Sequence, residues 1–139
     1  MRGMPSPRKT EQLMRAYLLL VAVLLVPIAL SYGLDPASVL PRFLNISVEG
    51  TDQTQIFRAL MCLYLGASIF WAIAALTPSW QRVAVIWSVF FALSLAFGRM
   101  LSLVLDGPAS RLLDIYLVVE ILGGLAGLAL LAYTRKPAP

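Results

Sequence analysis

Four long apolar runs, separated by short polar segments, dominate the pattern of the chain. They cover about residues 13–32, 55–76, 80–105 and 112–133. A bilayer hydrocarbon core is about 30 Å thick, and a helix needs about 20 largely apolar residues to cross it. Each run meets this length, so the pattern predicts an all-α integral membrane bundle of four transmembrane helices with antiparallel up-down topology.

The polar segments mark the boundaries of a single expected domain. A basic tail, 1–12, precedes the transmembrane domain, 13–134, and a short tail, 135–139, follows it. Segment 33–54 is rich in prolines, glycines and acids, a composition typical of turns, so we expect it to be an outer loop. Only a tight turn at Pro78 separates the second and third runs, so their helices are expected to be antiparallel neighbours.

The first run follows basic residues, as the apolar region of a secretory signal peptide does. The residues after it, beginning SYGLDP at Ser31, lack the small-residue pattern of a cleavage site, and the run is nearly long enough to span. We therefore expect a retained helix, with removal as a signal peptide as the alternative.

The positive charges favour a cytoplasmic location for both termini, because Lys and Arg are enriched on the cytoplasmic side of membrane proteins. In that orientation the larger group of cations is cytoplasmic: Arg2, Arg8, Lys9, Arg15, Arg82, Arg135 and Lys136. The smaller group lies on the outer side: Arg42, Arg58, Arg99 and Arg111.

Composition supports the membrane assignment and argues against several classes of function. Of the 139 residues, 60% are hydrophobic and 13% are charged, against about 25% charged in a soluble domain. The net charge is +4, but the cations lie at helix ends and form no basic patch, so we expect membrane lipid as a partner and no nucleic acid. The chain has no histidine and one cysteine, Cys62, so we expect no metal and no cofactor.

Two charged residues within the predicted spans are candidates for a functional site. A charge at the centre of a transmembrane helix costs at least about 2.5–3.5 kcal/mol, so such residues usually face the bundle interior and have partners. Arg99 and Glu120 both lie about 9–10 Å below the outer ends of their predicted helices, at a rise of about 1.5 Å per residue. Equal depth allows the two side chains to pair.

Further polar residues extend this pair into a predicted cluster in the outer half of the bundle. Ser102 and Asp106 follow Arg99 at helical spacing and therefore share its face. Arg58 lies near the outer start of the second predicted helix. The candidate ligand-binding residues are Arg58, Arg99, Ser102, Asp106 and Glu120, with Tyr64 or Tyr116 at the edge.

Three interpretations of this cluster stay open. Arg99 and Glu120 can form a structural ion pair that locks two helices. Alternatively, Arg58 and Arg99 can bind a carboxylate or phosphate at the floor of an outward-facing pocket. The third interpretation is passage of a proton or an ion through Glu120.

Gly123, Gly124 and Gly127 follow Glu120 on the last predicted helix. The spacing of Gly123 and Gly127 is the GxxxG pattern, which lets two membrane helices approach closely. We expect these glycines to serve helix packing within the bundle, with homodimerisation as the alternative.

Several segments resemble one known family. They are IFRALMCLYLGASIFW (Ile56–Trp71), GRMLSLVLDGPAS (Gly98–Ser110) and YLVVEILGG (Tyr116–Gly124), preceded by YGLDP (Tyr32–Pro36). The family consists of small bacterial four-helix membrane proteins catalogued as domain of unknown function 4345. The resemblance covers nearly the whole chain from the first run onward and implies a multi-pass protein of the bacterial inner membrane, with no activity attached.

The sequence therefore favours a small non-enzymatic inner-membrane protein, acting as a binding or accessory subunit of a larger membrane complex or as a homodimer. The alternative is a small transporter or channel for an anionic solute or a proton, using Arg99 and Glu120. A membrane enzyme that modifies a lipid or a quinone is the least favoured class.

Overall fold

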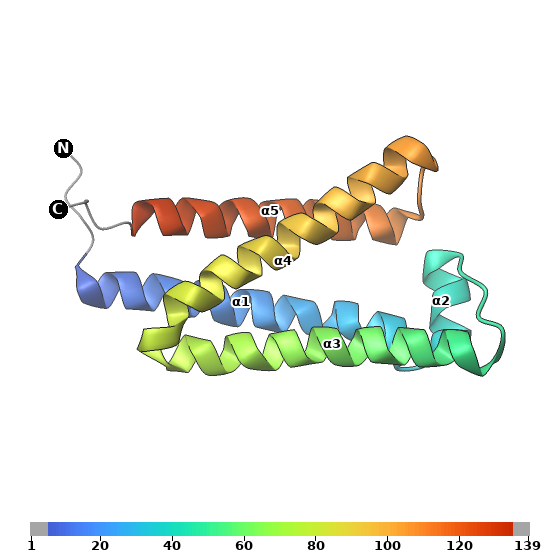
Figure 1. The fold of residues 1–139 in the computed structure, drawn as a ribbon, viewed down its shortest axis with the longest axis horizontal. Coiled ribbons are helices and arrows are strands. Elements are labelled where there is room, and N and C mark those ends of the chain that lie inside the picture. Colours follow the sequence, from blue (N-terminus) through green and yellow to red (C-terminus); the bar gives the residue numbers. More distant parts are fainter. Residues whose placement is uncertain (1–5, 135–139) are drawn as a thin grey trace.

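The computed structural model describes residues 6–134, which fold into five helices and no strand (Figure 1). The helices are α1 (Pro7–Gly33), α2 (Pro36–Leu44), α3 (Gly50–Leu76), α4 (Pro78–Leu105) and α5 (Arg111–Tyr133). Residues 1–5 of the predicted tail 1–12 and the whole predicted tail 135–139, with Arg2, Arg135 and Lys136, lie outside the described residues.

Helices α1, α3, α4 and α5 are each long and apolar enough to cross a membrane, which confirms the predicted fold class. Much of their apolar surface points outward: Val23, Phe90 and Val104 are 67%, 68% and 81% exposed. Moving such a side chain out of water is favourable by about 1.5–3 kcal/mol, so this surface is suited to lipid.

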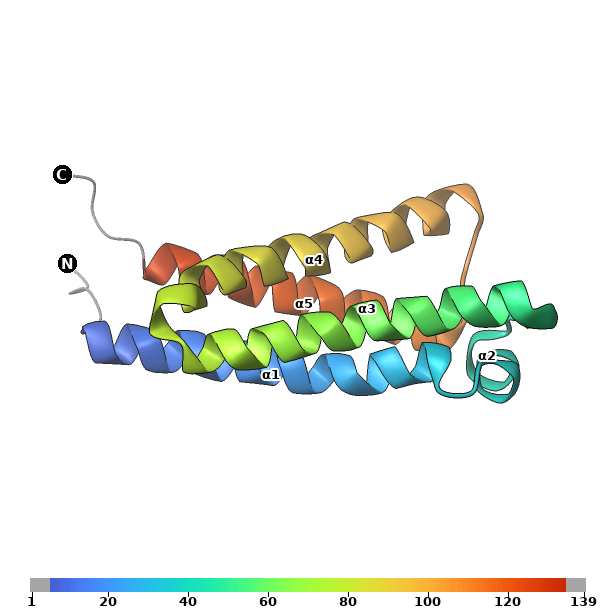
Figure 2. The same cartoon turned by 60° about the horizontal axis from the view of Figure 1, so that its bottom comes forward.

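The four long helices run in alternating directions along one axis (Figure 1). Helices α1 and α3 lie side by side along their length, whereas α4 packs on α5 at an angle (Figure 2). The start of α1, the end of α5 and the α3–α4 turn share one end of the bundle. Helices α4 and α5 separate toward the opposite end, where α2 lies, and we call this the α2 end.

The predicted outer loop, 33–54, is wrong as a description of the whole segment, since it contains α2 and the first turn of α3. Pro36 starts α2 at a position where its missing N–H costs no helical hydrogen bond. Asn45 ends the helix in the left-handed conformation, with φ of 55°. Leu40 and Leu44 are buried against the bundle, so α2 is held in place by its apolar face.

Three long helices also begin before the predicted spans, at Pro7, Gly50 and Pro78 in place of 13, 55 and 80. The start of α1 is capped by Ser6, whose Oγ accepts the backbone N–H of Lys9 at 3.4 Å. Hydropathy marks the part of a helix that suits hydrocarbon, and a helix continues into polar solvent wherever its backbone can.

Helices α1 and α3 approach most closely near the α2 end. A Cβ atom on Gly33 would lie 2.8 Å from the carbonyl oxygen of Phe57, a backbone atom that cannot easily move away. Farther along the same interface, the hydroxyl of Ser68 donates to the carbonyl oxygen of Ala22 at 2.8 Å. The absence of a side chain at position 33 therefore sets the spacing of this helix pair.

The glycines of α5 serve the contact between α4 and α5, although not in the predicted pairing. A Cβ atom on Gly124 would overlap the side chain of Leu93, and one on Gly127 would overlap Val89. A Cβ atom on Gly123 would meet nothing within 4 Å. Close packing therefore uses Gly124 and Gly127, and the GxxxG pair of Gly123 and Gly127 is not the contact.

Candidate functional site

Arg99 of α4 and Glu120 of α5 face each other within the bundle and form an ion pair. Arg99 Nε lies 2.8 Å from Oε2 and 3.0 Å from Oε1 of Glu120, and it donates to both oxygens. Glu120 is 7% exposed, and the Arg99 side chain is 17% exposed. The pair joins α4 to α5 near the level at which the two helices begin to separate.

Tyrosines from two helices fix the orientation of the guanidinium group. Arg99 Nη2 donates to the hydroxyl of Tyr32, on α1, at 3.2 Å. The Arg99 guanidinium carbon lies 5.6 Å from the ring centroid of Tyr116, on α5, a cation–π contact. The hydroxyls of Tyr116 and Ser31 are hydrogen-bonded at 2.9 Å, which ties α5 back to α1.

Tyr64 joins the cluster from α3 through its ring. Its ring packs edge-on against Tyr32 with 5.9 Å between centroids. Of the two tyrosines named as candidates for the cluster's edge, Tyr116 contacts Arg99 directly, whereas Tyr64 reaches it through Tyr32. Sequence reasoning missed Tyr32, although its position in the last turn of α1 places it at the same end of the bundle as Arg99.

The structure does not bring the other predicted members into this contact. Ser102 donates to Asp106 at 2.8 Å, but both residues are exposed and lie one turn apart on α4. Arg58 is exposed on α3 and forms no salt bridge with any described residue. The structure therefore does not bring Arg58 and Asp106 into contact with Arg99 and Glu120: Arg58 is exposed on α3, and Asp106 lies at the exposed end of α4.

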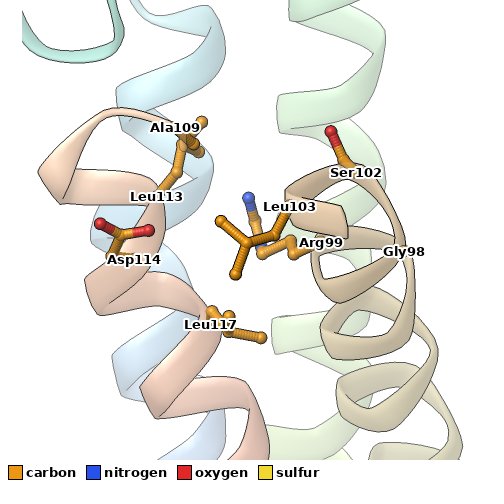
Figure 3. Close-up of a pocket in the computed structure, with 8 residues that line it drawn as sticks. All are labelled: Gly98, Arg99, Ser102, Leu103, Ala109, Leu113, Asp114 and Leu117. Carbon is orange, nitrogen blue, oxygen red and sulfur yellow. The ribbon is translucent and has the colours of Figure 1, made fainter. Parts of the chain in front are cut away.

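A groove of about 230 Å³ opens between α4 and α5 where the two helices separate, and we call it the α4–α5 groove (Figure 3). Its polar lining residues are Arg99, Ser102 and Asp114. Leucines from both helices form most of its apolar wall: Leu103, Leu113 and Leu117. Gly98 also lines it, and a Cβ atom there would meet nothing within 4 Å, so the missing side chain leaves the groove open.

A second, smaller cavity of about 70 Å³ lies on the other side of the ion pair, toward the interior of the bundle. Its lining includes Glu120, Tyr64 and Trp71. The indole N–H of Trp71 is buried without a hydrogen-bond partner among the described residues, and its ring packs edge-on against Phe91 at 5.3 Å. Arg99 thus borders the groove, while Glu120 borders the interior cavity.

Tyr17 closes the part of this cavity away from the ion pair. Its hydroxyl donates to the carbonyl oxygen of Gly123 at 3.0 Å and lies 3.1 Å from Ser88 Oγ. No group of three or more His, Cys, Asp or Glu side chains in residues 6–134 is arranged to hold a metal ion. The side chains near the ion pair can therefore act through hydrogen bonds and charge pairing by arginine, carboxylate and hydroxyl groups.

Together these features define a multi-pass, four-span helical membrane protein with an intramembrane Arg–Glu pair beside an open groove. The family model for the domain of unknown function DUF4345 matches residues 13–131, and the chain belongs to this family. This confirms the resemblance carried by the segments around Arg58, Arg99 and Glu120. No curated protein and no solved structure matches the chain.

Proposed function

We propose that this protein is a non-enzymatic binding protein of the bacterial inner membrane, which holds the polar head of a membrane amphiphile in the α4–α5 groove. The observation that carries the proposal is the position of Arg99. Arg99 lines an open groove whose apolar wall is formed mostly by three leucines. A polar donor beside the apolar wall of a groove suits a molecule with a polar head and an apolar tail.

Arg99 has hydrogen-bonding capacity left for a ligand. A guanidinium group carries five N–H donors. Within the described residues, Glu120 takes the donor on Nε and Tyr32 takes one donor on Nη2. The pair of donors on Nη1 and the second donor on Nη2 are therefore available. Each hydrogen bond from a charged donor to a ligand oxygen would contribute about 1.5–3 kcal/mol.

Glu120 gives the site a stable resting state. An unpaired arginine at this depth would be costly in a bilayer, and the carboxylate offsets that cost when the groove is empty. Tyr32 and Tyr116 hold the guanidinium at a fixed angle, which reduces the rotamer entropy lost on binding. A ligand would therefore meet a guanidinium group that is already oriented.

The groove also has a suitable entrance for a molecule that is already in the membrane. Its wall residue Leu103 is 44% exposed, and the neighbouring Val104 is 81% exposed. An acyl chain can lie along this surface while the head reaches Arg99. Binding by Arg58 and Arg99 together is not proposed, since Arg58 lies outside the groove.

The test compares two glycines that are alike except for their position. Gly98 and Gly66 are both exposed helical glycines at which an added Cβ atom would meet nothing within 4 Å, but only Gly98 lines the groove. Gly98→Leu should block the groove, and Gly66→Leu serves as the matched control. Native mass spectrometry of protein released from nanodiscs counts the amphiphiles that each variant retains.

We expect the wild-type protein and Gly66→Leu to retain an amphiphile that Gly98→Leu loses, while circular dichroism shows equal helix content for all three. Equal retention by Gly98→Leu would refute the groove as the binding site. A wild-type protein that retains no amphiphile would refute the proposed function.

A further inference from the structure

The proposed function leaves open which head group the groove accepts, and the charges around it narrow the choice. Arg99 lines the groove, but its charge is already balanced by Glu120 at 2.8 Å. Asp114 also lines the groove and forms no salt bridge with any described residue. The groove therefore combines free N–H donors with one carboxylate.

A head group that carries only one sign of charge is repelled by one residue of this groove. A purely anionic head group is attracted by the donors of Arg99 but repelled by Asp114. A purely cationic head group is attracted by Asp114 but repelled by Arg99. A head group with acidic oxygens and an ammonium group satisfies both parts of the groove.

Arg99 and Asp114 present opposite charges to one groove. They come from opposite walls of the groove, Arg99 from α4 and Asp114 from α5 (Figure 3). Arg99 lies six residues before the end of α4 at Leu105, and Asp114 lies three residues after the start of α5 at Arg111. At about 1.5 Å per residue, Arg99 lies about 9 Å from the end of α4 and Asp114 about 4–5 Å from the start of α5.

These depths suit the head-group region of a bilayer. Helix α4 has 28 residues and is about 42 Å long, and α5 has 23 residues and is about 35 Å long, against a hydrocarbon core of about 30 Å. If each helix is centred in the core, Arg99 and Asp114 both lie about 2–3 Å inside the hydrocarbon boundary. A lipid phosphate at that boundary can accept from Arg99, while an amine linked to it reaches across the groove to Asp114.

We propose that the α4–α5 groove selects a zwitterionic lipid with a primary amine on its phosphodiester, of the phosphatidylethanolamine type, through Arg99 and Asp114. This rests on the proposed function and specifies its ligand. Arg111 is the cation nearest in sequence to Asp114, but the two form no salt bridge among the described residues, so the carboxylate is available to the amine. Asp114 is exposed at the groove, as an ammonium partner must be.

The experiment measures lipid preference. The full-length protein is placed in nanodiscs of equal phosphatidylethanolamine and phosphatidylglycerol, and native mass spectrometry gives the ratio of the two lipids retained. We expect wild-type protein to retain mainly phosphatidylethanolamine. Asp114→Asn should lower the ratio about two- to fivefold, the effect of an exposed ion pair, and Asp114→Glu should restore it.

Asp52→Asn is the matched control, because Asp52 is also an exposed aspartate in the first turn of a long helix but does not line the groove. It should leave the ratio unchanged. Retention of phosphatidylglycerol in equal or greater amount by the wild-type protein would overturn the zwitterion inference and leave the proposed function standing.

Two further outcomes separate the remaining possibilities. A wild-type protein that retains no lipid would overturn both the proposed function and this inference. Soluble phosphoethanolamine is added as a competitor, and it should not displace the lipid at millimolar concentration. Displacement would identify a free metabolite as the ligand and overturn the choice of a lipid.

Discussion

The double-mutant cycle on Arg99 and Glu120 tests the central contact of this protein. Arg99→Ala leaves Glu120, which is 7% exposed in the wild-type structure, without its cation, and Glu120→Ala leaves the guanidinium with Tyr32 and Tyr116 alone. Removing one member of a buried ion pair destabilises by about 3–5 kcal/mol. We expect the loss of stability for Glu120→Ala to lie at the lower end of this range, because the Arg99 side chain is 17% exposed and can extend toward the groove and water.

The double variant Arg99→Ala/Glu120→Ala removes both charges, so neither is left buried without a partner. Its loss of stability should therefore be smaller than the sum of the single losses by about 2–3 kcal/mol, which is large for a contacting pair. The assay is unfolding of the detergent-solubilised protein by increasing mole fractions of SDS. Tryptophan fluorescence, to which the buried Trp71 contributes together with Trp80 and Trp87, reports the loss of helix packing.

The exposed hydrogen bond between Ser102 and Asp106 provides the control cycle. It has the same 2.8 Å length as the shortest contact of the ion pair, but it lies on the surface of α4. Ser102→Ala and Asp106→Asn should each change the free energy of unfolding by less than about 0.5 kcal/mol. Additive losses at Arg99 and Glu120, within about 0.3–0.5 kcal/mol, would refute the reasoning that the pair is energetically coupled.

Three other predictions concern packing and orientation. Gly124→Val should destabilise by about 1–3 kcal/mol through overlap with Leu93, whereas Gly123→Val, with open space around it, should be nearly neutral in the same SDS titration. Tyr32→Phe removes the hydroxyl that accepts from the guanidinium group and should cost about 1–2 kcal/mol; no change would mean that Arg99 is oriented without it. Leu40→Ala should cost about 2–5 kcal/mol because Leu40 is fully buried, and faster proteolysis within α2 would locate the loss.

The charged residues of α4 and α5 show how much of the site the sequence could predict. Arg99 and Glu120 stood out because charges are rare in apolar runs, and equal depth along two helices followed from a constant rise per residue. Helical spacing and position near the outer helix ends also predicted Asp106 and Arg58 as members of the cluster. Both are exposed in the structure, and the uncharged Tyr32 contacts Arg99 instead.

The sequence by itself determined the four membrane-length helices, because each apolar run is long enough to cross a bilayer and needs no partner to satisfy its backbone. It also determined the spacing of residues along each helix, through the constant rise per residue, although the helices begin earlier than the apolar runs. Only the tertiary structure decided which way each helix face points, since that rotation depends on packing at positions such as Gly33 and Gly124. The tertiary structure also set the angle between α4 and α5, and this angle opens the groove beside Arg99.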